Sequence, residues 1–209
     1  MQYHTNATFQ KEIARKLVEI ACEFVDLKNA KTFTDVGCGS GFIAEKLLEI
    51  GVLKEKITQL DHNPSKLSFA SQFGKTQIWD FNKPYTGTEK FDVIFSSMAL
   101  QWAKDFNQTL SHIDKMLAAG GVFFFAVPVN NSLESVYKTL GKRFMEFEKE
   151  EKINAKMVKK IEYRQNAYDA LKSMHILGLK AGQQKITKEM VRELKATETV
   201  WEIGVFVVK

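Results

Sequence analysis

Three glycines at alternate positions follow a short apolar run and one acidic residue in the stretch 34–42, Thr-Asp-Val-Gly-Cys-Gly-Ser-Gly-Phe. This order predicts a strand, a tight turn and a helix, because glycine permits positive φ and lets a ligand approach the main chain closely. The predicted helix would offer unpaired N–H groups and the positive end of its dipole. The stretch therefore predicts an α/β fold with a ligand-binding loop after its first strand.

Two classes of ligand compete for this loop, and a turn that binds nothing is the third possibility. Dinucleotide sites use the spacing G-x-G-x-x-G, whereas the third glycine here comes one position earlier. Asp35 stands just before the turn, where its carboxylate would repel a pyrophosphate and attract an ammonium or sulfonium group. S-adenosylmethionine (SAM) carries both cations, so the loop favours SAM.

The chain alternates predicted strands and helices, which is typical of a parallel sheet with crossover helices. The predicted strands are 32–36, 56–60, 77–81, 91–96, 122–127 and 156–163, with a closing strand at 199–208. The predicted helices are 8–25, 41–50, one starting at 63–65, 106–117, 133–149, 167–177 and 187–195. We predict one domain, with a helical cover (1–30), a SAM-binding core (31–128), a mostly helical substrate-covering segment (129–195) and a closing strand (196–209).

Two acidic residues follow the second and third predicted strands. Asp61 comes about twenty residues after the glycine loop, where doubly wound folds place a carboxylate against ribose hydroxyls. Asp80 and Phe81 form an acidic–aromatic pair that is suited to an adenine amine and ring. The alternative for Asp61 is a solvated aspartate at a strand end, and His62 is expected to be its neighbour rather than a catalyst.

The positive charge of the chain is concentrated in one segment. Residues 129–195 carry 15 Lys and Arg against nine Asp and Glu, whereas residues 1–128 carry 14 of each. This segment is either a solvated helical surface or a landing surface for an acidic protein or nucleic acid. Cys22 and Cys38 lack metal-ligand spacing, so we predict neither a zinc site nor a disulfide. With no signal-like or spanning segment, a cytoplasmic protein is expected.

The loop 35–41, Asp61, Asp80 and the strand 91–94 resemble the motifs of class I SAM-dependent methyltransferases over about residues 30–128. The resemblance implies a Rossmann-like, seven-stranded, mostly parallel sheet with an antiparallel last strand and helices on both faces. It also implies SAM as methyl donor and no metal. The cofactor-binding residues that we predict are Gln10, Asp35, Gly37, Cys38, Gly39, Gly41, Asp61, His62, Asp80, Phe81 and Ser96.

A narrower resemblance is to the malonyl-acyl-carrier-protein O-methyltransferases of biotin synthesis. The segment 96–102, Ser-Ser-Met-Ala-Leu-Gln-Trp, is similar to their S-N-L-A-L-Q-W, although Ser97 replaces the usual Asn. Tyr3, Ala7 and Gln10 are similar to their opening motif, 171–178 to their L-K-x-I-G element, and 199–203 to their closing strand. The region between the fifth and last strands, which covers the substrate in that family, is shorter here.

This resemblance implies methylation of the free malonyl carboxylate on an acyl-carrier protein. Such a carboxylate is ionised at neutral pH and needs no general base, so positioning and water exclusion are the expected contributions of the protein. Tyr3, His4 and Trp102 are the predicted positioning residues. Lys138, Lys142 and Arg143, at helical spacing, are predicted to meet the acidic carrier.

Several alternatives stay open. The acceptor could be a small molecule or RNA, or the protein could bind SAM without catalysis. The segment 96–99 lacks the N/D-P-P-Y/F sequence of base N-methyltransferases, and regularly interleaved aromatic residues are missing from the basic segment, so nucleic acid is not expected. We expect no membrane partner and a monomer.

Overall fold

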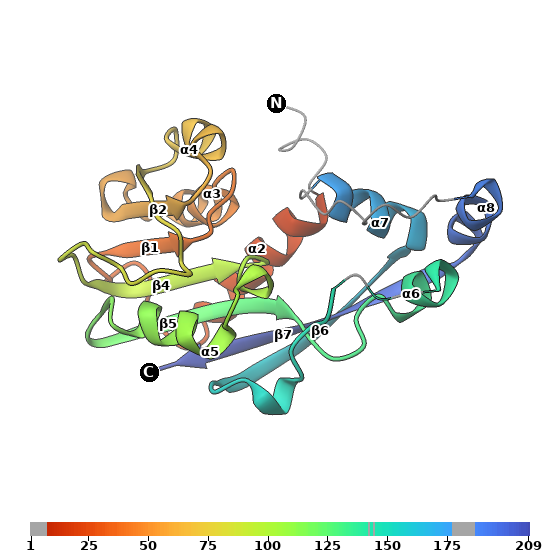
Figure 1. Ribbon diagram of the computed structural model, residues 1–209. Coiled ribbons are helices and arrows are strands. Elements are labelled where there is room, and N and C mark those ends of the chain that lie inside the picture. The colour runs from red at the N-terminus through yellow and green to blue at the C-terminus, as the bar shows by residue number, and fades with distance from the viewer. Residues whose placement is uncertain (1–7, 142, 144, 177–186) are drawn as a thin grey trace.

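A single seven-stranded sheet organises the molecule in the computed structural model, which describes residues 8–141, 143, 145–176 and 187–209 (Figure 1). The strands lie in the order β3-β2-β1-β4-β5-β7-β6. Their bounds are β1 Phe33–Val36, β2 Ile57–Asp61, β3 Lys75–Ile78, β4 Phe91–Ser97, β5 Leu117–Pro128, β6 Lys156–Asn166 and β7 Glu198–Val208. The predicted strands are all present, and the third lies two to three residues earlier than expected.

The strand directions match the expected class. β1 pairs in parallel with β2 and β4, β2 with β3, and β4 with β5. β7 is antiparallel to both β5 and β6. The mostly parallel sheet with an antiparallel last strand is therefore confirmed.

Helices cover both faces of the sheet, as predicted. Their bounds are α2 Thr8–Ala21, α3 Phe42–Glu49, α4 Pro64–Ala70, α5 Phe106–Asp114, α6 Glu134–Leu140, α7 Ala167–Ile176 and α8 Lys188–Ala196, with 3-10 turns η1 Lys54–Lys56, η2 Leu100–Trp102 and η3 Glu150–Lys152. One core cluster joins α2, α3, α6 and α7 to one face of the sheet, and a second joins α5 to the other face. Burial of these apolar faces is the main driving force for the arrangement.

The first helix shows how the pattern of the sequence positions the site. Phe9, Ile13 and Leu17 recur at helical spacing and are buried against the sheet. On its flank Lys11 pairs with Glu45 of α3 at 2.8 Å. These contacts fix α2 beside α3.

Three predicted helices are wrong in length. The helix predicted over 8–25 ends at Ala21, the helix predicted over 106–117 ends at Asp114, and the helix predicted over 133–149 ends at Leu140. Gly141 follows with φ +69°, a left-handed conformation that stops an α-helix. Apolar spacing beyond 141 instead reflects packing of an irregular segment, in which Phe147 is buried against Trp201.

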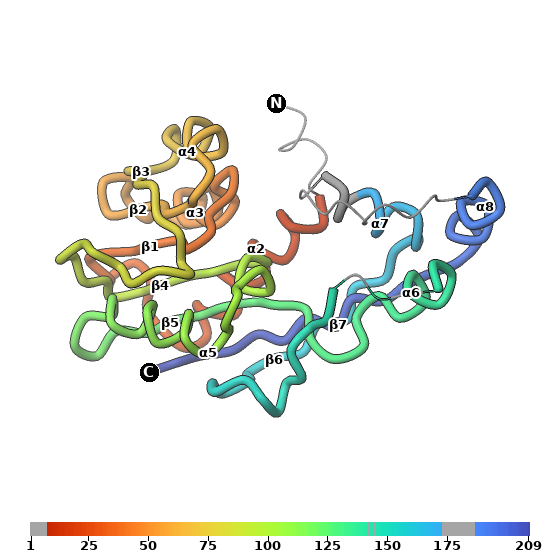
Figure 2. Tube along the Cα trace, viewed as in Figure 1, coloured from red at the N-terminus to blue at the C-terminus, as the bar shows by residue number. Residues whose placement is uncertain are grey.

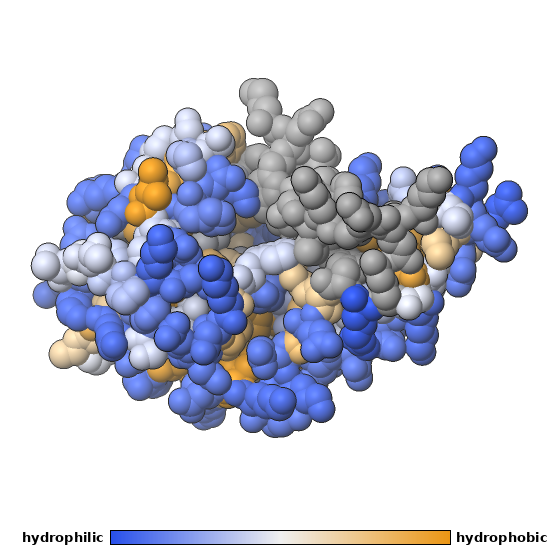
Figure 3. Space-filling view, in the orientation of Figure 1, coloured by the Kyte–Doolittle hydropathy of each residue, from blue (hydrophilic) through white to orange (hydrophobic). Residues whose placement is uncertain are grey.

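β6 and β7 run side by side away from the core toward α6, α7 and α8 (Figure 2). β6 is an edge strand whose Lys156, Lys159 and Lys160 are exposed, as an edge strand that avoids aggregation requires. The visible face is mainly hydrophilic, with a small hydrophobic patch over β3, the strand that carries the exposed Ile78 (Figure 3). Within the ranges given above, no helix has the length and hydropathy of a membrane span.

Candidate functional site

The glycine loop after β1 takes the conformation that its sequence predicts. Gly37 has φ +70°, and a Cβ there would lie 2.5 Å from the Cβ of Ala99. The N–H groups of Gly37 and Cys38 both donate to the carbonyl of Leu60, at 2.8 and 3.0 Å. The loop is thus held against the end of β2 with space only for glycine at position 37.

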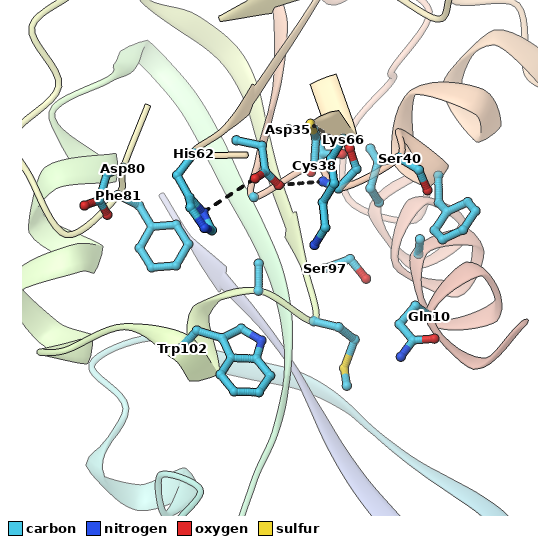
Figure 4. Close-up of a pocket in the computed structure, with 18 of the residues that line it drawn as sticks. Gln10, Asp35, Cys38, Ser40, His62, Lys66, Asp80, Phe81, Ser97 and Trp102 are labelled. Atoms are coloured by element: carbon cyan, nitrogen blue, oxygen red, sulfur yellow. Dashed lines mark hydrogen bonds and ion pairs between the residues drawn. The ribbon is translucent and has the colours of Figure 1, made fainter. Parts of the chain in front are cut away.

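A cavity of about 450 Å³ opens at the carboxyl ends of β1, β2 and β4. The connections after β1 and β4 leave toward opposite faces of the sheet, and this is where open α/β sheets bind ligands. The cavity brings together ten predicted residues: Gln10, Asp35, Gly37, Cys38, Gly39, Asp61, His62, Asp80, Phe81 and Trp102 (Figure 4). The fold has therefore gathered groups from five separate segments around one space.

Two predicted cofactor residues do not line the cavity. Ser96 is fully buried, and its hydroxyl donates to the carbonyl of Val36 at 2.8 Å, so it joins β4 to β1. Successive side chains of a strand alternate between faces, and Ser97 occupies the lining position instead. Gly41 precedes α3, close to Gln59 and Phe73, and serves the helix start. Tyr3 and His4 lie outside the described residues.

Asp61 is the best-connected carboxylate in the site. Its Oδ2 accepts from the N–H of Gly39 at 2.9 Å, and its Oδ1 accepts from the N–H of Asn63 at 2.8 Å. The Nδ1 of the exposed His62 lies 3.5 Å away. Donors at both oxygens orient the carboxylate toward the cavity, which suits the two hydroxyls of a ribose.

Asp35 differs sharply from Asp61. It is 2% exposed, and its Oδ1 has no hydrogen-bond partner in the described part of the chain. Burial, and then the negative charge of Asp61, raise the pKa of Asp35 well above its ordinary value. A cationic ligand in the cavity would stabilise the Asp35 carboxylate by ion pairing, whereas a pyrophosphate would repel it.

Asp80 and Phe81 are held by the connection between β3 and β4. The Oδ1 of Asp80 accepts from the backbone N–H and the side-chain amide of Asn82, at 3.0 and 2.9 Å. Burial opposes ionisation, yet these bonds, with Lys83 and His62, lower the pKa of Asp80. Nδ1 of the buried His112 lies 3.3 Å from the carbonyl of Phe81. An anionic acceptor and a fixed ring are available for an adenine.

One wall of the cavity carries only side chains that do not ionise. This uncharged wall comes from α2, the start of α3 and the segment after β4: Gln10, Ala14, Phe42, Ile43, Ser97, Met98, Ala99 and Trp102. The Oγ of Ser97 is buried and has no hydrogen-bond partner among the described residues. Met98 has φ +52° and its N–H donates to the carbonyl of Ala126, which turns the chain sharply at the end of β4.

Sequence reasoning missed Ser97 and Met98 as lining residues, although it singled out their segment. The left-handed backbone of Met98 leaves no mark in the sequence, because methionine has no preference for that region. Lys66 of α4 also lines the cavity, and only its position one turn after Asn63 could have indicated this.

Cys38 is the cysteine that lines the cavity. Burial raises the pKa of the Cys38 thiol well above its ordinary value, and Asp35 and Asp61 raise it further when they are ionised, so the thiol stays protonated. The described residues hold no cluster of three or more His, Cys, Asp or Glu that could bind a metal ion.

The predicted cationic helix face at 138–143 is not formed. α6 ends at Leu140, so Arg143 does not continue the helix that carries Lys138. The Arg143 guanidinium is bonded to Glu134 and lies 4.9 Å from the Tyr137 ring centroid. Lys142 lies outside the described residues. Helical spacing failed here because Gly141 ends the helix before the second cation.

Comparison with known proteins shows that the chain is similar in sequence to methyltransferases. Residues 34–125 match the family described as "Methyltransferase domain". The malonyl-[acyl-carrier protein] O-methyltransferase of Calditerrivibrio nitroreducens is 29% identical over 140 residues, covering 64% of this chain and 53% of that protein. The protein of the same name from Hamiltonella defensa is 26% identical over 162 residues, covering 72% and 60%. The chain thus spans about half of these relatives' length.

Solved structures share the fold. The YcgJ protein of Bacillus subtilis superposes with a TM-score of 0.63 at 11% identity, covering 92% of this chain and 97% of that one. The plantazolicin methyltransferase BpumL, solved with SAH, has a TM-score of 0.55 at 11% identity, with coverages of 100% and 87%. The strand order and these neighbours show the class I methyltransferase fold, residues 34–125 match a methyltransferase domain, and the carboxylate-lined cavity suits SAM as the cofactor.

Proposed function

We propose that this protein transfers a methyl group from SAM to the free carboxylate of a malonyl group carried by an acyl-carrier protein. The residues that would hold SAM are Asp61 at the ribose, Asp80 and Phe81 at the adenine, and Asp35 with the glycine loop at the methionine end. When bound, SAM supplies an electrophilic methyl group on its sulfonium. The remaining task of the protein is to present a nucleophile to that methyl in a dry, fixed geometry.

The uncharged wall is the observation that carries the proposed acceptor. None of its eight described residues is able to remove a proton. This wall therefore offers no base to an acceptor, which suits a nucleophile that arrives already ionised. A malonyl carboxylate, whose pKa is about 4, is such a group at neutral pH. The Ser97 hydroxyl is positioned to donate to it, and the half-buried Trp102 limits access of water.

The relatives support the same acceptor. The two relatives described above carry the name malonyl-[acyl-carrier protein] O-methyltransferase. Biotin synthesis is the proposed context, because the resemblance of the segment 96–102 is to enzymes of that pathway.

A cationic surface for the acidic carrier lies on α8 rather than on α6. Lys188, Arg192 and Lys195 follow one another at spacings of four and three on this helix, and all three are exposed. None of them forms an ion pair with another described residue, whereas Arg143 is already bonded to Glu134. We assign to this α8 stripe the carrier contact that the sequence suggested for 138–143.

An acceptor panel tests the proposal. Purified protein is incubated with methyl-labelled SAM and, separately, malonyl-carrier protein, a free malonyl thioester and tRNA. We expect label on the carrier-bound substrate, with the free thioester a much poorer acceptor. Labelled tRNA would instead support an RNA methyltransferase. Tight SAM binding without transfer to any acceptor would support a binding protein.

A further inference from the structure

The two carboxylates beside the glycine loop have opposite surroundings. Asp61 receives N–H donors on both oxygens, which stabilises its anion. Asp35 is just as buried, yet no described residue donates a hydrogen bond to its side chain or forms an ion pair with it. Asp35 nevertheless lines the cavity (Figure 4).

An isolated buried carboxylate is costly as an anion, because the low-dielectric interior does not replace its hydration. The charged and titratable groups that line the same space are Asp61 and His62 after β2, Cys38 in the loop, Lys66 on α4 and Asp80 after β3. Asp61 adds repulsion, and the Cys38 thiol carries no charge. His62 is exposed and sits against Asp61. Burial and Asp61 account for the shift in the pKa of Asp35, and Lys66 makes no contribution to it. The neutral acid is therefore the favoured form of Asp35 in the empty cavity.

We propose that Asp35 holds a proton while the cavity is empty and releases it to solvent when SAM binds. The inference rests on the proposed function and concerns the same site. SAM carries a sulfonium and an ammonium against one carboxylate, so its arrival supplies the cation that Asp35 lacks. Only the O–H bond of Asp35 breaks, and the proton leaves to buffer.

This proton distinguishes substrate from product. After methyl transfer the sulfonium has become a neutral thioether, while the ammonium remains. Ionised Asp35 then faces less positive charge than it does beside SAM. A larger proton release is expected with SAM than with the product, S-adenosylhomocysteine.

Calorimetric titration of the full chain in phosphate and in Tris measures the release, because the two buffers take up a proton with different enthalpies. We expect the SAM binding enthalpy to depend on the buffer, and the affinity to rise toward tenfold per pH unit while free Asp35 is protonated. The ligand's own amine titrates near pH 8 in every sample, so a comparison of variants isolates the protein group.

Asp35→Asn should bind SAM with a buffer-independent enthalpy and a flat pH profile. The matched control is Asp80→Asn, which removes a cavity carboxylate whose pKa is lowered and which is already ionised. It should weaken binding and retain the proton release. An infrared band of a protonated carboxyl, lost on adding SAM to the unaltered protein, tests the same point without a variant.

The outcomes separate the two claims. SAM binding with a buffer-independent enthalpy in the unaltered protein overturns the proton release and leaves the proposed function standing. Equal release in Asp35→Asn and the unaltered protein overturns the assignment to Asp35. Absence of any SAM binding overturns both claims.

Discussion

Gly37 is the residue at which backbone conformation and close packing coincide. An alanine there would add the strain of a left-handed conformation and a contact of 2.5 Å with Ala99. We expect Gly37→Ala to lower the free energy of unfolding by about 2–4 kcal/mol and to abolish SAM binding. Urea unfolding and SAM titration measure these two effects.

Gly51→Ala is the control for that substitution. Gly51 has φ +93°, but a Cβ there would meet no atom within 4 Å. It should therefore show the backbone strain of about 1–2 kcal/mol alone and leave SAM binding intact. Equal effects of the two substitutions would mean that the close approach to Ala99 does not matter.

Asp35 also predicts an unusual dependence of stability on pH. Its raised pKa means that the folded, empty protein binds a proton that the unfolded chain gives up above about pH 4. Stability from this group is present at lower pH and is lost as the pH rises toward the folded pKa. Relative to Asp35→Asn, the unaltered protein should lose up to about 1.4 kcal/mol per pH unit in that window.

Denaturant unfolding of both proteins at a series of pH values checks this expectation. Asp80→Asn again serves as the control, because the lowered pKa of Asp80 gives the opposite sign, with stability lost on acidification. A constant difference between Asp35→Asn and the unaltered protein at all pH values would mean that Asp35 is not protonated in the empty fold.

Ser97 is the polar group of the uncharged wall whose hydroxyl lacks a partner among the described residues. If it donates to the acceptor carboxylate, Ser97→Ala should lower kcat/KM by about tenfold, the value of one hydrogen bond of roughly 1–1.5 kcal/mol. SAM affinity should not change. Steady-state kinetics with malonyl-carrier protein decide this, and an unaltered kcat/KM would remove Ser97 from the acceptor site.

At the scale of elements, the α8 stripe is tested by charge reversal. Lys188→Glu with Arg192→Glu should raise KM for the carrier-bound substrate at least tenfold and weaken its dependence on salt, because attraction to an acidic partner is lost. The control is Lys54→Glu with Lys75→Glu, two exposed lysines on η1 and β3 that change net charge equally. Equal effects of the two pairs would point to net charge and not to the stripe.

How far the elements followed from the sequence depends on the kind of information each one needs. The alternation of apolar strands with amphipathic helices was enough to predict the parallel part of the sheet, since burial patterns are local. The antiparallel last strand was expected only from the resemblance to class I methyltransferases. The length of α6 could not be predicted in this way, because the left-handed Gly141 ends the helix although the apolar pattern continues beyond it.

The site shows the same division. Asp35 and Asp61 lie at the carboxyl ends of β1 and β2, and Asp80 lies just after β3, so their meeting at one edge followed from the parallel order. Whether Ser96 or Ser97 lines the cavity depends on the face of the sheet to which each side chain points. Arg143 was predicted to contact a partner protein, but it pairs with Glu134, and that contact depends on the tertiary structure. Neither the orientation of the two serines nor the pairing of Arg143 can be predicted from the spacing of residues in the sequence.

At the scale of the whole molecule, the core of the class I fold forms the cavity for SAM and carries its carboxylates. The outer parts of β6 and β7 extend away from this core, and α6, α7 and α8 lie beside them (Figure 1). The central claim joins these parts: the cavity delivers a methyl group to a carboxylate on a carrier protein. A carboxyl methyl ester is cleaved by mild alkali, whereas a methyl group on nitrogen or carbon is not.

The most direct measurement therefore follows the transferred methyl group. Malonyl-carrier protein is incubated with the full chain and methyl-labelled SAM, isolated, and treated with mild alkali. The account predicts label on the carrier that alkali releases as volatile methanol, with no label on carrier that lacks malonyl. Label that resists alkali, or label that appears equally on carrier without malonyl, would contradict it.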